Sequence, residues 1–276
     1  MTRLLVLDFD GTMTDAEAEG APYRQGYLED IAAMCGLDHD EVHALAARFE
    51  AQIAAAPEAH GWIFDGAIVA PATVDPYLRV MPVARRILDH AGVLLDERDR
   101  ARLLDGILYK YNYQKTRDVP WPDTGGVLRA LAGRPVYVVT NSHTEAVQKK
   151  VRALGGLDWL VDRVHGRARK YAIDNDFSAV PLSMSLPGLG RPVLLRRRLY
   201  CEVIEALRAE VGADWSDVAV VGDIFELDLA LPLAMGARVG LMVNRFTPPW
   251  EKAFIDAHPR GVLLGTVADI PGFVGW

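Results

Sequence analysis

The 276 residues of the chain are enough for a sizeable buried core together with a smaller accessory domain. Half of the residues are hydrophobic and 24% are charged, which is typical of a globular protein rather than a disordered one. The formal net charge of -7 argues against a protein that coats nucleic acid or an anionic membrane, so neither is expected as a partner.

The first predicted element is a strand at residues 3–8, which is short, apolar and continuous, like strands buried on both faces of a parallel sheet. Residues 13–120 then change in character, and their amphipathic patterns predict helices at 41–56, 83–90 and 96–114. No segment of this block has the pattern of a buried strand. We therefore expect a helical cap at residues 15–118, inserted into a core formed by residues 1–14 and 119–276.

Beyond residue 120, apolar segments alternate with helical patterns. Strands are predicted at 135–139, 218–221 and 238–243, and helices at 127–131, 144–154 and 200–211. This alternation indicates an α/β fold with a Rossmann-like, doubly wound parallel sheet. Residues 163–198 are rich in proline, glycine and basic side chains, and they predict a loop or hairpin elaboration. Its basic residues are expected to form a charged surface or, alternatively, to line the cleft for a multiply anionic substrate.

Polar side chains follow three of the predicted strands at the points where the strands end. Asp8 and Asp10 follow the first, Thr140 the second and Asp223 the third. Parallel strands bring their carboxyl ends to one edge of the sheet, so these residues are expected to converge. With Asp228 nearby, so many carboxylates would repel one another unless a cation held them. Hard oxygen ligands that leave room for water and phosphate suit Mg²⁺.

These segments resemble the motifs of the haloacid dehalogenase superfamily. Asp8-Phe9-Asp10-Gly11-Thr12 is similar to the first motif, and Thr140 after its apolar strand is similar to the second. Gly222-Asp223, followed five residues later by Asp228, is similar to the fourth. The resemblance covers roughly residues 1–14 and 119–245. The helical block lies where members with a C1-type helical cap carry that cap, which would close over the site.

The resemblance implies a Mg²⁺-dependent phosphohydrolase that acts on a small phosphorylated metabolite. Asp8 would attack phosphorus and form an aspartyl-phosphate, while Asp10 would serve as general acid and then as general base. Mg²⁺ would be bound by Asp8, the backbone carbonyl of Asp10 and Asp223, and Asp228 would support the metal shell. The dehalogenase branch lacks the second aspartate of the first motif, so Asp10 favours phosphoryl transfer over dehalogenation.

The phosphate itself would be held by the Thr140 hydroxyl, by the adjoining Asn141 and by a basic residue. The third motif of the superfamily is usually a lysine just before the helix that leads to the fourth motif. The corresponding place here holds Arg196-Arg197-Arg198, and counting back from Asp223 favours Arg197. Lys170 is a less favoured substitute because it falls in the irregular segment.

Two alternatives remain open from the sequence. A phosphomutase of the same fold would pass the phosphoryl group to a sugar instead of water. A catalytically inactive binding protein is favoured only by the missing motif lysine. The two cysteines, Cys35 and Cys201, form no C-x-x-C pair, and the initial apolar run is too short for a signal peptide or a membrane span. A cytoplasmic protein is therefore expected.

Overall fold

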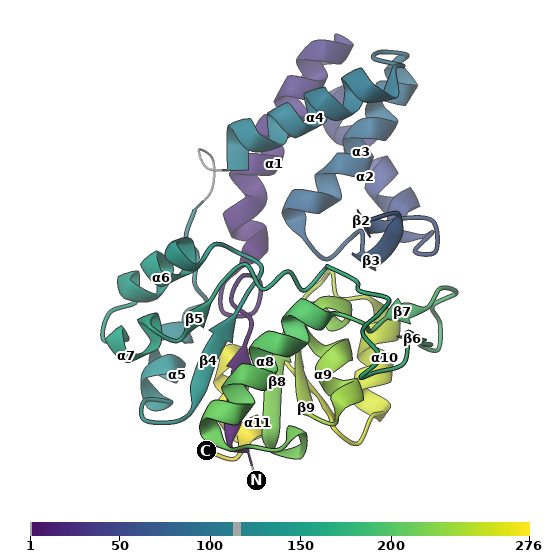
Figure 1. Cartoon of the computed structure of the whole chain (residues 1–276). Helices are drawn as coiled ribbons and strands as arrows, with labels where there is room; N and C mark the ends of the chain where they lie inside the picture. Colours follow the sequence, from purple (N-terminus) through teal and green to yellow (C-terminus); the bar gives the residue numbers. More distant parts are fainter. Residues whose placement is uncertain (1, 113–116) are drawn as a thin grey trace. The chain divides into compact units, whose positions relative to one another are not determined.

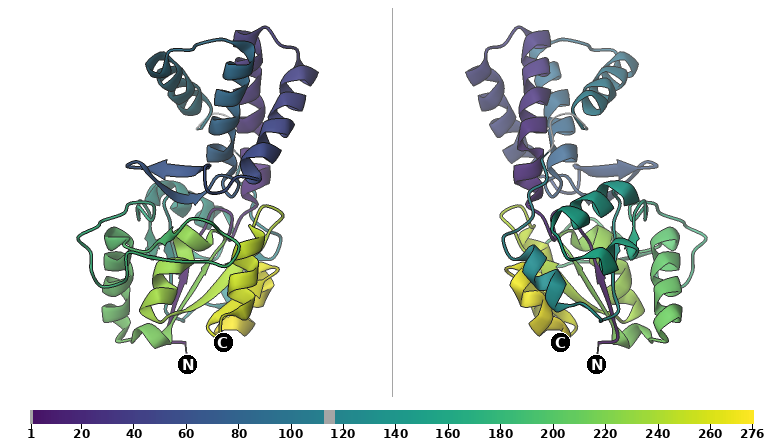
Figure 2. Two further views of the ribbon diagram at one scale, coloured as in Figure 1. Left: turned by 90° about the vertical axis from the view of Figure 1, so that its right-hand side faces the viewer. Right: turned by 90° about the vertical axis from the view of Figure 1, so that its left-hand side faces the viewer.

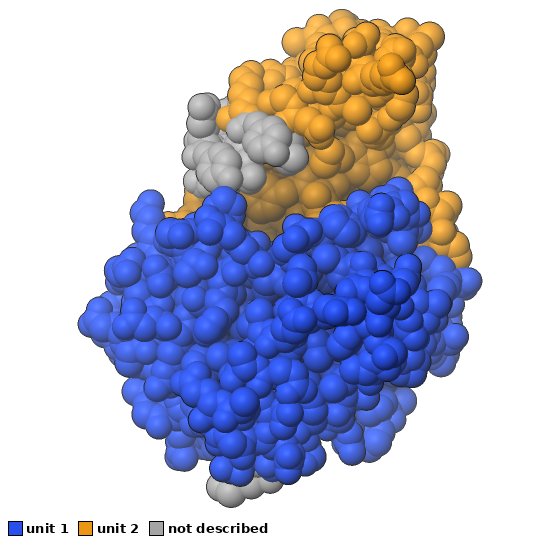
Figure 3. Space-filling view, viewed as in Figure 1, with its two compact units in different colours: residues 1–15, 63–70, 120–276 blue, residues 16–62, 71–119 orange. Residues whose placement is uncertain are grey.

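The computed structural model describes residues 2–112 and 117–276. The chain forms two compact units (Figure 3). Residues 1–15, 63–70 and 120–276 make the core unit, and residues 16–62 and 71–119 make the helical unit. Residues 63–70, which the sequence prediction placed in the cap, belong to the core unit.

The core unit is built on one parallel sheet of six strands in the order β10-β9-β8-β1-β4-β5 (Figure 1). The strands are β1 (Leu4–Leu7), β4 (Val136–Val139), β5 (Val164–His165), β8 (Val218–Gly222), β9 (Arg238–Met242) and β10 (Gly261–Leu264). At the centre, Leu5 of β1 is in register with Val136 on one side and Ala219 on the other. The predicted parallel α/β fold is confirmed, and β5 and β10 extend it at the edges.

Helices cover both faces of this sheet (Figure 2). Leu4 and Val6 pack with α8 (Arg198–Val211), α9 (Ala230–Met235) and α10 (Pro249–Ala257). Leu5 and Leu7 face the opposite way, toward α5 (Thr124–Ala130), α6 (Thr144–Ala153), α7 (Asp158–Val161) and α11 (Ile270–Val274). Because side chains alternate along a strand, a continuous apolar run such as Leu4–Leu7 supplies both cores.

The helical unit consists of α1 (Ala16–Cys35), α2 (His39–Ala54), α3 (Pro76–Ala91) and α4 (Glu97–Asn112). Asp38 begins α2 with a reciprocal capping box to Glu41, and Gly92 ends α3 in the left-handed conformation. The predicted helices at 41–56 and 83–90 correspond to α2 and α3, and α3 begins earlier, with Pro82 inside it. Residues 113 and 114, the end of the third predicted helix, lie outside the described residues. The helix α1 was not predicted.

A hairpin of β2 (Gly61–Phe64) and β3 (Ala67–Pro71) corrects the expectation that the inserted block holds no buried strand, because Val69 and Ala70 of β3 are fully buried. Its turn is Asp65-Gly66, with φ of 48° and 77°. Positive φ at both central residues is the geometry that Asp-Gly favours in two-residue hairpins. The Phe64 ring lies 5.0 Å from the ring of Tyr171 in the core unit, between centroids.

The basic segment 163–198 contains an antiparallel hairpin of β6 (Ser183–Met184) and β7 (Val193–Leu194), as expected for an elaboration of this kind. Leu186, Val193 and Leu195 are buried in the core of the sheet face that carries α8. Arg191 makes a bidentate ion pair with the buried Glu226, with N–O distances of 2.6 and 2.9 Å. The segment is therefore packed structure rather than simply a solvated charged surface.

Within residues 2–112 and 117–276, none of the helices combines the length and the apolar character that crossing a bilayer requires.

One buried carboxyl group makes the stability of the fold pH-dependent. Glu251 at the start of α10 is fully buried, and neither of its oxygens makes a well-formed hydrogen bond with the described residues. Burial, reinforced by the Glu226 carboxylate, raises the pKa of Glu251 well above its usual 4.5. The folded state thus holds this proton more tightly than the unfolded state, so the contribution to stability is complete below about pH 4.5 and is lost as pH rises.

We expect Glu251→Gln to remove this pH dependence. Relative to the variant, wild type should lose up to about 1.4 kcal/mol of unfolding free energy per pH unit above pH 5, since one proton is involved. Urea titrations of both proteins between pH 5 and 9 measure the difference. Parallel stability curves for the two proteins would show that Glu251 does not carry the effect.

Candidate active site

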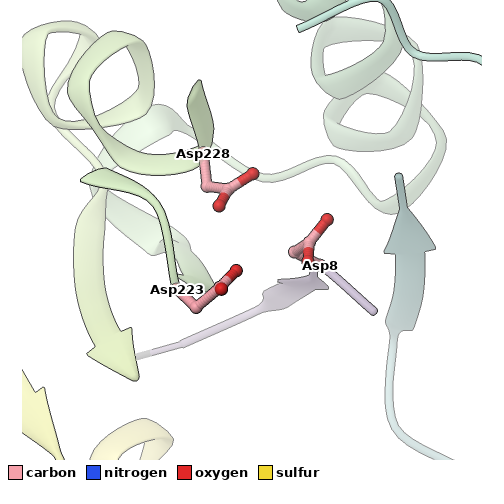
Figure 4. A group of neighbouring side chains, drawn as sticks. All are labelled: Asp8, Asp223 and Asp228. Carbon is pink, nitrogen blue, oxygen red and sulfur yellow. The ribbon is translucent and has the colours of Figure 1, made fainter. Parts of the chain in front are cut away.

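Three carboxylates meet where the central strands of the sheet end. Asp8 follows β1, Asp223 follows the neighbouring β8, and Asp228 comes from a π-helical turn, Phe225–Leu229, just beyond (Figure 4). One ligand oxygen from each lies within 4.8 Å of the others, and all three residues are buried. The predicted convergence of Asp8, Asp223 and Asp228 is thus present in the structure, at the point where strand order reverses in a doubly wound sheet.

The turn after β1 is fixed by the residues that follow the nucleophile candidate. Gly11 has φ of 88°, and a Cβ at this position would lie 2.2 Å from Asp223 Oδ2. Only glycine combines this backbone conformation with so close an approach. The buried Thr12 hydroxyl lies 3.1 Å from Asp8 Oδ2 and 3.4 Å from Asp223 Oδ1, so its single proton can be donated to either carboxylate.

The position of Asp228 depends on equally close packing. A Cβ on Gly222 would lie 2.4 Å from the Asp228 Cβ, so the strand end must be glycine. Asp228 Oδ2 accepts a 3.0 Å hydrogen bond from the Ile224 N–H. The buried Tyr200 hydroxyl donates to the Asp228 backbone carbonyl at 2.9 Å. These contacts aim the Asp228 side chain at the cluster.

Lys170 supplies the positive charge of the cluster. Its Nζ lies 2.7 Å from Asp8 Oδ1 and 2.7 Å from Asp228 Oδ1, and the residue is 1% exposed. Burial alone would lower the pKa of Lys170, but the Asp228 and Asp8 carboxylates outweigh it and raise the pKa, so the ammonium stays charged. The preference for Arg197 over Lys170 is therefore corrected: the lysine reaches the carboxylates from the irregular segment.

Arg197 and Asn141 both form hydrogen bonds with the main chain of Lys170 instead of lying beside the carboxylates of the cluster. The Arg197 guanidinium donates to the Lys170 carbonyl and, at 2.9 Å, to the Val69 carbonyl. Asn141 Oδ1 accepts from the Lys170 N–H at 2.8 Å. Arg197 is fully buried, and burial lowers its pKa to about 10, which still leaves it charged at neutral pH. In this structure Arg197 and Asn141 therefore hold the main chain of Lys170, whereas the sequence predicts that both contact the phosphate.

Thr140, at the end of β4, is buried with its hydroxyl turned toward the following loop. Its Oγ1 accepts a 3.1 Å hydrogen bond from the Ser142 N–H, which is a local turn of the kind that serine and threonine form. The hydroxyl proton remains available for a further acceptor. This geometry is compatible with the predicted phosphate contact of Thr140.

The carboxylate of Asp10 is held apart from the other three. Its Oδ2 accepts from Ser142 Oγ at 2.6 Å, and its Oδ1 from Lys150 Nζ at 2.7 Å. The Asp10 side chain is 29% exposed, in contrast to 10% for the Asp8 side chain. The side chain of Asp10 is not part of the three-carboxylate group. A metal contact through Asp10 would therefore use its backbone carbonyl, as the resemblance implies.

The charges of the cluster suit a divalent cation. Burial raises the pKa of the Asp8 carboxyl, and the Lys170 ammonium lowers it again in part. Three buried carboxylates face one ammonium, so the cluster carries an excess of negative charge that desolvation makes costly. The donors are all hard oxygen atoms, which is the chemistry of a Mg²⁺ site. The residues present thus fit such an ion.

Comparisons with known proteins agree with this architecture. A family model described as haloacid dehalogenase-like hydrolase matches residues 2–236. No curated protein matches the chain. Among solved structures, the HAD-hydrolase YfnB from Bacillus subtilis, bound to magnesium, is similar with a TM-score of 0.58, 14% identity, and coverage of 100% of this chain and 99% of that one.

Two further structures share the fold. A predicted phosphoglycolate phosphatase from Haemophilus somnus has a TM-score of 0.55 and 17% identity over 98% of this chain and 97% of its own. A haloacid dehalogenase-like protein from Agrobacterium tumefaciens has a TM-score of 0.54 and 13% identity over 100% of this chain and 98% of its own. At these identities the likeness shows the fold alone.

The close contact at Gly11 gives a direct test of the site geometry. We expect Gly11→Ala to lower the unfolding free energy by about 2–5 kcal/mol, because the new Cβ combines an unfavourable backbone conformation with a clash against Asp223. Gly126→Ala is the control, since a Cβ there, within α5, meets nothing within 4 Å. Urea titration measures both, and equal stability of the two variants would contradict the described turn.

Proposed function

The chain belongs to the haloacid dehalogenase-like hydrolase family, and from this premise we propose that it is a Mg²⁺-dependent phosphatase, a phosphoric monoester hydrolase acting on small phosphorylated metabolites. The observation that carries the proposal is the separation of two carboxylates on one strand end. Asp8 lies against Lys170 and the carboxylates of Asp223 and Asp228, while Asp10 is held elsewhere by Ser142 and Lys150. A nucleophile and a proton-transfer group need such different surroundings.

In the first step, an Asp8 oxygen attacks phosphorus. The new bond between the Asp8 oxygen and phosphorus forms as the ester bond to the leaving oxygen breaks, and Asp10, which enters this step as the protonated acid, gives that oxygen its proton. In the second step, Asp10 takes a proton from a water molecule that attacks the aspartyl-phosphate. The Asp8–phosphorus bond breaks, free phosphate leaves, and both aspartates return to their starting states.

The remaining residues of the cluster would bind and neutralise charge. Asp8, Asp223 and Asp228, with the Asp10 backbone carbonyl, would hold Mg²⁺, which when bound neutralises the charge of the phosphoryl group. The Lys170 ammonium is placed to balance the charge on Asp8 and on an incoming phosphoryl oxygen. The Thr140 hydroxyl would bind a second phosphoryl oxygen.

The position of Lys170 also helps to choose among the alternative functions. A missing motif lysine is the one feature that favours an inactive binding protein, and the 2.7 Å contact between Lys170 Nζ and Asp8 Oδ1 supports an enzyme instead. Asp10, whose carboxylate is partly exposed and hydrogen-bonded, favours a phosphatase over a dehalogenase. No feature of the described residues favours a phosphomutase, so the transfer of the phosphoryl group to water is the function we propose.

The nucleophile is tested with 4-nitrophenyl phosphate in the presence of Mg²⁺. Asp8→Asn should lower kcat by at least about a thousandfold, because the amide cannot form the aspartyl-phosphate. Release of inorganic phosphate is measured beside nitrophenol, and stoichiometric phosphate separates a hydrolase from a phosphomutase. Equal activity of wild type and Asp8→Asn would exclude Asp8 as the nucleophile.

Metal binding is tested without any substrate. We expect isothermal titration calorimetry to show one Mg²⁺ per chain, with the affinity reduced at least about tenfold in Asp223→Asn. Asp217→Asn, a change outside the cluster, serves as control and should bind like wild type. Removal of the metal by EDTA should abolish hydrolysis, and Mg²⁺ should restore it. Full activity in EDTA would exclude the metal-dependent mechanism.

A further inference from the structure

The carboxylate of Asp10 has a partner on each of its two oxygens, and the partners come from different elements. Ser142 lies in the loop after β4 and meets Oδ2 at 2.6 Å, whereas Lys150 lies in α6 and meets Oδ1 at 2.7 Å. We propose that Ser142 and Lys150 are positioning residues that hold Asp10 in the orientation needed to protonate the leaving oxygen. This inference rests on the proposed phosphatase function.

Ser142 is itself held by its backbone. Its N–H donates to Thr140 Oγ1 at 3.1 Å, and its carbonyl accepts from the Arg167 N–H at 2.8 Å. The Ser142 Oγ atom therefore projects from a loop whose backbone is fixed by hydrogen bonds on both sides of the residue. A short hydrogen bond from such a donor constrains the acceptor, because the donor does not follow the carboxylate when it turns.

Lys150 is anchored by the helix that carries it. Its neighbours Val147 and Val151 are fully buried against the sheet, which sets the rotation of α6. The Lys150 side chain is only 18% exposed, so its ammonium is screened less than that of a surface lysine. Lys149, the adjacent residue of the same helix, is exposed. The two lysines thus offer a matched pair for substitution.

Holding the carboxylate by both oxygens has a kinetic consequence. A carboxyl group that protonates a leaving oxygen must point its proton along the breaking bond, and a small misplacement is costly. This requirement is stricter for a poorer leaving group such as phenolate, whose oxygen is the more basic and departs less readily as an anion. It is relaxed for a good leaving group such as nitrophenolate. The fall in activity when a positioning residue is substituted should therefore depend on the leaving group.

The test compares kcat/KM for phenyl phosphate and 4-nitrophenyl phosphate. Lys150→Met should lose about a hundredfold on phenyl phosphate and less than about tenfold on 4-nitrophenyl phosphate, the pattern expected when general acid catalysis is impaired. Ser142→Ala should show the same pattern with a smaller loss, and Lys150→Arg should recover most of the activity. Lys149→Met should match wild type on both substrates. Equal losses on the two substrates, or no loss, would overturn the proposal.

A measurement independent of activity separates this inference from the proposed function. In crystals of Lys150→Met the Asp10 carboxylate should adopt a different or a mixed orientation, while Asp8 and Lys170 keep their contact. An unchanged, single orientation of Asp10 would overturn the positioning role. Wild-type protein without activity above Asp8→Asn would instead overturn the phosphatase proposal, and the crystals would still decide whether Lys150 orients Asp10.

Discussion

The ammonium of Lys170, placed between Asp8 and Asp228, is the interaction on which the rest of the site depends. Strand ends converge because the sheet is parallel, but convergence also gathers buried negative charge that the fold must balance. One buried lysine balances part of that charge and leaves an excess that suits a divalent ion. Leaving these carboxylates uncompensated would be strongly destabilising, so the same contact serves both folding and the proposed chemistry.

The residues around Lys170 fix the position of its flexible side chain. Asn141 and Arg197 hold the Lys170 backbone, and the Lys170 ammonium lies 5.4 Å from the centre of the Tyr200 ring. Because Lys170 lies in an irregular segment, its position depends on these contacts. The proposed proton-transfer group follows the same principle, since each Asp10 oxygen has its own donor. Two carboxylates two residues apart thus acquire different surroundings from different elements.

The residues that sequence reasoning could place are those whose position follows from a strand. Asp8, Thr140 and Asp223 follow continuous apolar runs, so the parallel sheet determines where they lie. Lys170 could not be placed this way, because the path of the irregular segment is set by contacts distant in sequence. The sequence favours Arg197 wrongly as the cation beside the carboxylates, because a run of arginines before a helix looks like a motif cation until the burial of each residue is known. The hairpin had a readable signal in Asp65-Gly66, whereas Gly20, Pro22 and Gly26 obscured the helical pattern of α1.

A crystal structure with Mg²⁺ and beryllium trifluoride, a mimic of the phosphoryl group, would show directly whether Asp8 and the metal ion share one site. We expect beryllium to be bonded to an Asp8 oxygen, with one metal ion roughly 2.0–2.1 Å from carboxylate oxygens of Asp8 and Asp223. Lys170 should remain in contact with Asp8. A metal ion bound away from these carboxylates, or beryllium attached to a different residue, would show that Asp8 is not the nucleophile of a metal-dependent phosphatase.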